Sequence, residues 1–434
     1  EIPPRSHYDL EPYYLVAGRG NWEVVRQLWR WLNQPSTVRE DCRPAVYPVS
    51  DASFDPSPLL ITRPETTSSF IVRNRRGKAM NGKWQIEDCK LQIEPESGEL
   101  SDVKRGSPSV QEIAVAVTDF TPRVETARVT VTENVTTNEF VIPAVILGNS
   151  DSPVTYNSEC PEGKPATISV DNSYLSFTVA PTFLGSATAL ERNGVNHLKS
   201  SYPEAGPYVW LNPWFGGIHP YLGGMWNPRF VNEKFTGEPV ERTGKYGIIW
   251  RGVKVCSDLQ HKDDCWLRME IEYLTIGCSN VLAIVQRLTN RTDASHWAGA
   301  GIGAWLAVGG SISNNMLHYT QARPCYEQAA SAGEHTRVMR QRYRDEYSFE
   351  APRGRWVAVE NPETGDVIAS IPSHPRARIE AEVEGKDTAT FFWLDAGTNL
   401  EPNETKETVS WMVLSDSVKE AQKYRALEEI CELP

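Results

Sequence analysis

The chain has 434 residues, 40% hydrophobic residues and a formal net charge of -12, and these values exclude several classes of protein. At about 150 residues per domain, the length predicts more than one domain. An acidic chain is not expected to bind nucleic acid, because phosphates attract basic surfaces. No stretch approaches the roughly 18 consecutive apolar residues that a membrane-spanning helix requires. The composition also argues against collagen-like, coiled-coil and disordered chains.

The first predicted element is a helix in the N-terminal arm, which covers residues 1–44. Apolar side chains recur at helical spacing from Trp22 to Leu32. Asn21 is a suitable N-cap, and Pro35 ends the pattern. We expect this helix to pack its tryptophans on a sheet, and a helix that binds a partner is the alternative.

Residues 45–150 follow a period of two, which predicts short β-strands. Between 127 and 132, for example, Ala and Val alternate with Arg and Thr. Short strands with turn signals about ten residues apart are typical of an antiparallel sandwich. The segment 70–84 resembles an immunoglobulin-like β-sandwich module, so we expect such a sandwich over residues 45–150. A generic β-domain that acts as a spacer is the alternative.

A run of turn-forming residues between 148 and 165 predicts a domain boundary. Beyond it the alternation returns in longer strands. In the strand at 267–273 the odd-numbered residues are apolar or aromatic and the even-numbered residues are charged. We therefore expect residues 165–434 to form a second, larger antiparallel β-domain.

The chain closes with a predicted helix. Ser417 and Glu420 have the spacing of a capping box, in which each residue binds the backbone N–H of the other. Ala421, Tyr424 and Leu427 then recur at helical spacing, so we expect them to face the protein core.

Three segments of the second domain resemble the galactose-mutarotase-like (aldose epimerase-like) family. They are residues 175–194, a Gly-Gly-x-x-Pro loop within 203–220, and the strands at 273–292 that end in Asn-Arg-Thr. The resemblance covers about residues 166–414 and implies a large antiparallel β-supersandwich with a sugar ligand. Family members use a His as acid and a Glu as base on the sugar ring. No segment here reproduces the family's catalytic His neighbourhood.

The predicted fold class is therefore mainly β. An N-terminal helix and an immunoglobulin-like sandwich are followed by a large antiparallel β-supersandwich with a C-terminal helix.

Aromatic residues are concentrated in one loop-like segment, residues 210–229, which also holds four Gly and three Pro. Glycine lets the backbone approach a ligand closely, and ligand-binding residues are often found on loops. Trp210, Trp214 and Trp226 are predicted to stack on sugar rings, and Arg229 is predicted to bind a carboxylate as a two-pronged donor. The alternative is a loop that closes one end of the sandwich.

Three residues are candidates for proton transfer. His219 and Tyr221 lie in the aromatic segment, and Glu272 lies on the charged face of the strand at 267–273. On a concave sheet, Glu272 and the substrate-binding candidates Arg268 and Glu270 would point into a cleft. A solvent-exposed strand face is the alternative.

Other motifs point to no cofactor and no metal. Residues 299–304 fit the relaxed Gly-rich dinucleotide fingerprint, but their β-rich surroundings predict a close-packed strand instead. The charged loop at 261–265 is expected to be a solvated hairpin. Eight cysteines without a CxxC pair leave both redox state and cellular location open.

Two functional hypotheses follow from these patterns. The first is a carbohydrate-binding or carbohydrate-active protein, acting on a sugar or a uronate by isomerase- or lyase-type chemistry in the supersandwich. The alternative is a non-catalytic accessory or protein-interaction domain of a larger chain. Because the sequence starts at Glu1 without a Met, we expect either a processed form or a piece with a missing neighbouring domain.

Overall fold

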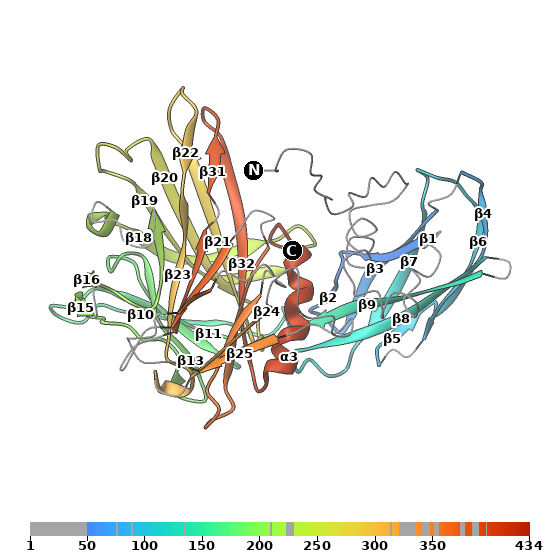
Figure 1. The fold of residues 1–434 in the computed structure, drawn as a ribbon, viewed down its shortest axis with the longest axis horizontal. Helices are drawn as coiled ribbons and strands as arrows, with labels where there is room; N and C mark the ends of the chain where they lie inside the picture. The colour runs from blue at the N-terminus through green and yellow to red at the C-terminus, as the bar shows by residue number, and fades with distance from the viewer. Residues whose placement is uncertain are drawn as a thin grey trace, which may run out of the picture.

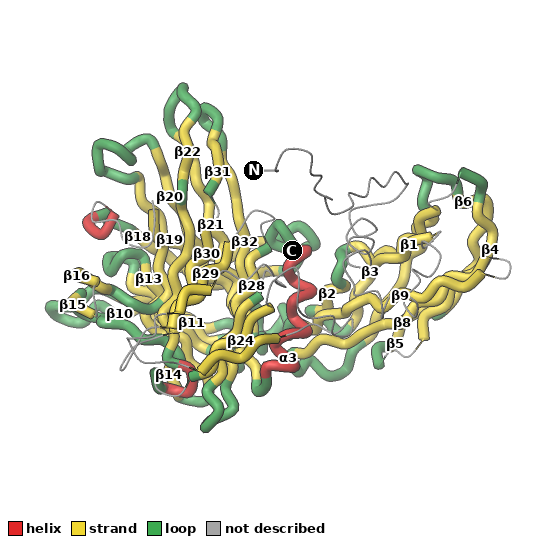
Figure 2. Tube along the Cα trace, in the orientation of Figure 1, coloured by secondary structure: helices red, strands yellow, loops and turns green. Residues whose placement is uncertain are grey.

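The computed structural model describes residues 50–74, 77–87, 90–133, 136–208, 211–222, 230–312, 315–320, 336–340, 348–350, 356–373, 378–383, 390–395 and 397–434. Within these ranges the protein is mainly β, as the sequence predicts, with one α-helix near the C-terminus (Figure 2). The predicted N-terminal helix lies outside the described residues. No helix in the described ranges is both long enough and apolar enough to cross a membrane.

The first part of the chain folds into a sandwich of two sheets. The four-stranded sheet has the order β1-β3-β7-β5 and the five-stranded sheet the order β2-β9-β8-β4-β6. The strands are β1 (Ser50–Asp55), β2 (Leu59–Ile61), β3 (Glu65–Asn74), β4 (Met80–Glu87), β5 (Gln92–Glu94), β6 (Ser97–Val103), β7 (Ser109–Ala116), β8 (Arg123–Glu133) and β9 (Thr136–Ile146).

Alternation along these strands builds the core of the first sandwich. Ala127, Val129 and Val131 of β8 are fully buried, which confirms the period-two pattern. Between the sheets, the ring of Phe70 lies 4.6 Å from that of Trp84. The immunoglobulin-like character of this sandwich stays a prediction.

The rest of the chain forms two larger sheets and two small ribbons. The ten-stranded sheet contains β10 (Thr155–Glu159), β11 (Thr167–Asp171), β12 (Ser176–Ala180), β13 (Ser186–Arg192), β14 (Val195–Asn196), β17 (Ile218–Leu222), β23 (Ala300–Leu306), β30 (Thr390–Asp395), β29 (Arg378–Val383) and β26 (Ser348–Glu350). The nine-stranded sheet contains β18 (Thr236–Thr243), β19 (Ile249–Asp258), β20 (Leu267–Thr275), β21 (Val281–Asn290), β32 (Thr405–Ser415), β28 (Val367–Pro372), β27 (Val357–Glu360), β24 (Met316–Thr320) and β25 (Thr336–Arg340). The ribbons pair β15 (Gly206–Tyr208) with β16 (Leu211–Trp214), and β22 (His296–Ala298) with β31 (Thr398–Leu400). Two short 3-10 turns, η1 (Phe230–Asn232) and η2 (Val308–Gly310), connect strands.

One continuous apolar core lies between the two large sheets. The odd-numbered residues 267–273 of β20 belong to it, as the sequence predicts. From the opposite sheet, Ile218 and Leu222 of β17 enter the same core. The hydroxyl of Tyr273 joins the sheets by donating to the carbonyls of Gly185 and Ile218, at 3.0 and 3.1 Å. Burial raises the pKa of Tyr273, so this phenol stays a proton donor.

A second apolar cluster connects the first sandwich to the large unit. Leu60, Val124 and Val145 of the first sandwich share it with Trp250 and Trp411 of the nine-stranded sheet. The helix α3 (Val418–Lys423) and the 3-10 turn η4 (Tyr424–Glu429) add side chains to the same cluster. Figure 1 shows α3 between the two parts of the molecule. The first sandwich therefore packs against the large unit, which is the part of the chain built from the ten- and nine-stranded sheets. The predicted domain boundaries remain a proposal.

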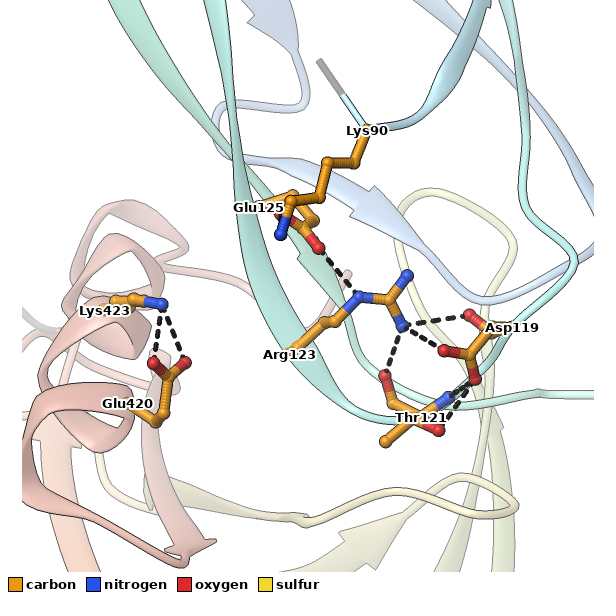
Figure 3. A network of polar contacts seen from close by, with 7 residues as sticks. All are labelled: Lys90, Asp119, Thr121, Arg123, Glu125, Glu420 and Lys423. Atoms are coloured by element: carbon orange, nitrogen blue, oxygen red, sulfur yellow. Dashed lines mark hydrogen bonds and ion pairs between the residues drawn. The ribbon is translucent and has the colours of Figure 1, made fainter. Parts of the chain in front are cut away.

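Polar residues form a rim beside this cluster, where α3 contacts β8 (Figure 3). Arg123 of β8 binds Glu125 at 2.9 Å and Asp119 at 3.0 Å. The hydroxyl and backbone N–H of Thr121 donate to Asp119 and lower the pKa of that carboxyl. On α3, Lys423 pairs with Glu420 at 2.7 Å. These pairs place the polar groups of the junction at its edge instead of inside the apolar cluster.

The C-terminal helix starts where the sequence predicts, although only half of the capping box forms. Ser417 is the N-cap, and its hydroxyl accepts the backbone N–H of Glu420 at 3.2 Å. The carboxylate of Glu420 binds Lys423 instead of reaching back to Ser417. The predicted apolar stripe of Ala421, Tyr424 and Leu427 is buried.

Removing the cap is expected to weaken the fold measurably. Ser417→Ala should lower the free energy of unfolding by about 1 kcal/mol, since it removes the acceptor of an orphan backbone N–H. Glu420→Gln is the control and should cost less than about 0.5 kcal/mol, because its partner Lys423 lies at the exposed surface. Chemical denaturation of both variants makes the comparison. Equal losses would contradict this description of the cap.

Candidate functional site

Two consecutive glycines turn the chain from β16 into β17. Gly216 and Gly217 both have φ of 67°, in the left-handed region. A Cβ atom at Gly217 would lie 2.2 Å from the carbonyl oxygen of Ala187, and one at Gly216 would lie 2.4 Å from that of Lys199. Only glycine fits at these positions, so the sequence fixes the turn that precedes His219.

Four aromatic side chains gather next to this turn, and we call them the aromatic cluster: Tyr208, Trp214, Tyr221 and Trp305. Tyr208 stacks on Trp214 with ring centroids 4.2 Å apart and planes 23° apart. Trp305 meets Trp214 edge-on at 5.5 Å. The cluster joins the ribbon β15–β16 to the outer face of the ten-stranded sheet, at the left edge of Figure 1.

The packing of the cluster corrects the role expected for Trp214. Trp214 is 5% exposed and Trp305 is 2% exposed. Because Trp214 is almost completely buried and Tyr208 stacks on its indole, Trp214 has no open ring face for a sugar. Tyr208 is the half-buried member of the cluster. The other predicted contacts of this segment, Trp210, Trp226 and Arg229, lie outside the described residues.

His219 and Tyr221 point to the same outer face of β17, because Ile218 and Leu222 point into the core. The backbone register places His219 opposite Gly303 and Tyr221 opposite Gly301. These glycines leave the neighbouring positions on that face without side chains. In strands, such glycines often mark the close approach of a ligand or of another backbone.

His219 is buried and neutral. Its Nδ1 lies 2.9 Å from the carbonyl oxygen of Pro220. Because a carbonyl only accepts hydrogen bonds, Nδ1 carries the proton and Nε2 is the acceptor of the neutral ring. Burial lowers the pKa of His219, which keeps the imidazole unprotonated at neutral pH.

Glu272 has a different environment from the one expected. It is 3% exposed and lies on the outer face of the nine-stranded sheet. Arg242 and Arg287 each donate to its carboxylate at 2.9 Å. Both arginines also bind Glu407, at 2.7 and 2.9 Å. The four side chains form a closed ring of alternating charges, so the Glu272 carboxylate is held by two arginines.

The substrate-binding candidates Arg268 and Glu270 pair with each other on the same face, at 3.4 Å. Arg268 also binds Asp258 at 3.4 Å. These contacts are those of a charged outer strand face, which the sequence left as the alternative to a cleft.

The candidates therefore separate into two groups. His219 and Tyr221 lie on the outer face of the ten-stranded sheet, and Glu272, Arg268 and Glu270 lie on the outer face of the nine-stranded sheet. The apolar core between the two large sheets separates the two groups. Because an acid and a base must reach one substrate atom, His219 and Glu272 do not form a catalytic pair in this structure.

Sequence reasoning missed two members of the aromatic cluster. Tyr208 precedes the segment that was singled out, and Trp305 follows it by some 80 residues in the strand β23. The run at 299–304 leads into β23, which confirms a close-packed strand in place of a dinucleotide-binding turn. Glycines at every second position before Trp305, at 299, 301 and 303, could have indicated that this face of the sheet is crowded.

Metal ligands do not converge in the described part of the chain. No three His, Cys, Asp or Glu side chains there come together as a cation site. In the charged loop, the backbone N–H groups of Gln260 and His261 donate to the buried carboxylate of Glu233, at 2.8 and 3.0 Å. That loop is thus held by a carboxylate cap.

Comparisons with known proteins give structural matches at low identity. No family model matches the sequence, and no curated protein sequence matches it. A TPR-domain containing protein from Parabacteroides distasonis is 11% identical with a TM-score of 0.44, covering 83% of this chain and 57% of its own. A galactose mutarotase-like protein from Clostridium acetobutylicum is 11% identical with a TM-score of 0.45, covering 60% and 98%. A putative aldose 1-epimerase from Klebsiella pneumoniae is 10% identical with a TM-score of 0.42, covering 64% and 88%. All three TM-scores are below 0.5, so the function of the chain has to be argued from its own side chains.

Breaking the charge ring should destabilise the fold. Glu272→Gln leaves two partly buried arginines without their main partner and is expected to lower the free energy of unfolding by about 3 kcal/mol. Glu407→Gln, at a more exposed corner of the ring, should cost about 1 kcal/mol. Urea denaturation distinguishes the two variants. A Glu272→Gln protein as stable as the parent would refute the structural role.

Burial of His219 predicts a pH dependence of stability. The folded ring resists protonation, whereas the unfolded ring takes up a proton below its ordinary pKa of about 6.5. The unfolded state therefore binds more protons, and the free energy of unfolding falls as pH decreases from 7 towards 5. His219→Gln should reduce this fall. Denaturation at several pH values provides the test, and an unchanged pH dependence in the variant would count against it.

Proposed function

We propose that the protein binds a carbohydrate on the outer face of the ten-stranded sheet, beside the aromatic cluster. The observation that carries the proposal is the position of Tyr208. Its ring stacks on the buried Trp214 and lies nearly perpendicular to Trp305, with the two ring centroids 5.9 Å apart, while the residue remains half-buried. An aromatic ring held in this way loses little conformational freedom when it contacts a ligand.

The chemistry around Tyr208 suits a sugar. Small-molecule sites combine aromatic walls with a few fixed polar groups. The apolar face of a pyranose can stack on an aromatic ring, and its hydroxyl groups need donors and acceptors beside that ring. His219, a neutral imidazole that is 8% exposed, lies on the same face of β17 as Tyr221, and the positions opposite these two residues are occupied by Gly303 and Gly301. Trp210, Trp226 and Arg229 of the adjoining segment stay predicted contacts, and Arg229 would select a uronate.

Within this proposal the protein acts as a binding module and not as a catalyst of the predicted type. Proton transfer on a sugar needs an acid and a base near one point. Glu270 and Glu272, the predicted carboxylates, pair with arginines across the sandwich from His219. This arrangement favours the accessory role over isomerase or lyase chemistry.

A glycan array followed by calorimetric titration tests the proposal. We expect binding to at least one neutral or uronate-containing oligosaccharide. Tyr208→Ala should weaken that binding about tenfold, a loss of about 1.4 kcal/mol. Tyr246→Ala is the control, because it also removes a solvent-accessible tyrosine ring, but one that contacts Asp55 of the first sandwich.

Two outcomes would overturn the proposal. Absence of binding to every glycan would favour the protein-interaction alternative. Equal binding by Tyr208→Ala and the parent protein would place the ligand elsewhere.

A further inference from the structure

A second aromatic side chain stands apart from the aromatic cluster. Trp297 of β22 is 61% exposed. Its strand pairs antiparallel with β31, and Trp297 lies directly opposite Asn399 in the register. In Figure 1 this ribbon lies at the top of the large unit, away from the β15–β16 ribbon at its left edge. The two places therefore belong to different elements and can be tested separately.

The indole of Trp297 is held in place by a glycine. A Cβ atom at Gly299 would lie 2.4 Å from Cη2 and 2.6 Å from Cζ3 of Trp297, so the six-membered ring packs directly against the backbone of Gly299. Gly299 has no left-handed φ, so its role here is to leave room for the ring. Trp297 as a whole nevertheless keeps 61% of its surface exposed.

The ribbon behind Trp297 is braced on both strands. On β22, the adjacent His296 stacks on Trp266, with ring centroids 4.4 Å apart and planes 15° apart. On β31, the ammonium group of Lys406 donates to the hydroxyl of Thr398 at 3.1 Å and to the carbonyl oxygen of Asn399. These contacts fix the backbone on which Trp297 and Asn399 are carried.

Trp297 and Asn399 present an aromatic surface and an amide to the same side of the ribbon. Side chains directly opposite each other in an antiparallel pair have Cβ atoms about 5 Å apart. Asn399 is exposed, and a primary amide can donate and accept hydrogen bonds at once. An aromatic ring beside such an amide matches the apolar face and the hydroxyl rim of one pyranose unit.

The size of this surface argues for a sugar over a protein partner. Protein-docking surfaces are contiguous apolar patches of a few hundred Å². Among the described residues, the other large exposed hydrophobic side chains lie on other elements: Val110, Val141, Tyr156 and Tyr246. Trp297 thus offers one exposed ring, opposite the polar side chain of Asn399.

We propose that Trp297 and Asn399 form a second carbohydrate-binding site, in which the indole stacks on a pyranose ring and the amide binds its hydroxyl groups. The inference does not depend on the site at Tyr208, because none of its residues belongs to the aromatic cluster.

Fluorine NMR of protein labelled with fluorotryptophan tests the proposal directly. The resonance of Trp297 is identified by its loss in Trp297→Phe. We expect that resonance to shift on titration with cellohexaose, maltohexaose or an oligogalacturonate. Asn399→Ala should weaken the response several-fold. Gly299→Ala should do the same while leaving the indole present, because the added methyl group displaces the ring. Tyr208→Ala should leave the response of Trp297 intact, which separates this site from the first.

Three results would overturn the proposal. The first is a Trp297 resonance that does not shift with any of the three oligosaccharides. The second is a shift of equal size in the parent protein and in both Gly299→Ala and Asn399→Ala. The third is a shift with protein concentration in the absence of sugar, showing that a second copy of the chain covers the indole.

Discussion

Successive side chains of a β-strand point to opposite faces of its sheet, and each large sheet buries one face in the core. These two facts together determine where the candidate side chains of β17 and β20 lie. On β20, Tyr273 enters the core, so its neighbour Glu272 must point outwards. On β17, Ile218 enters the same core from the opposite sheet, so His219 must also point outwards. The two side chains face away from each other across sheets that pack about 10 Å apart. No single sugar ring can contact both.

This constraint gives the two outer faces different chemistry. The outer face of the nine-stranded sheet carries the charge ring around Glu272 and, farther along, the apolar cluster that binds the first sandwich. The ionic groups of the charge ring are paired with one another, and the apolar cluster is covered by the first sandwich and α3. The outer face of the ten-stranded sheet instead carries the aromatic cluster, a neutral imidazole and glycines. The second face is the one whose composition resembles that of a ligand site.

Local pattern was sufficient to predict several strands and the C-terminal helix with their buried faces, but the segment at 210–229, predicted as a loop, contains the strands β16 and β17. The alternation at 267–273 and 127–132, and the stripe from Ala421 to Leu427, reflect periods of two and about 3.6 residues that burial enforces directly. The site was harder to predict because it depends on which strands are neighbours. Trp214 packs against Trp305, which comes from a strand far away in sequence. The sequence of neither strand predicts which distant strand it lies beside, or in what register. The two arginines that neutralise Glu272 are separated from it in the same way.

The location of the sugar site can be determined by a crystal structure. Crystals of the protein would be soaked with an oligosaccharide that binds on the glycan array. We expect a sugar ring in contact with Tyr208, on the outer face of the ten-stranded sheet that also carries His219. A ligand seated against Glu272 and its two arginines would contradict this expectation.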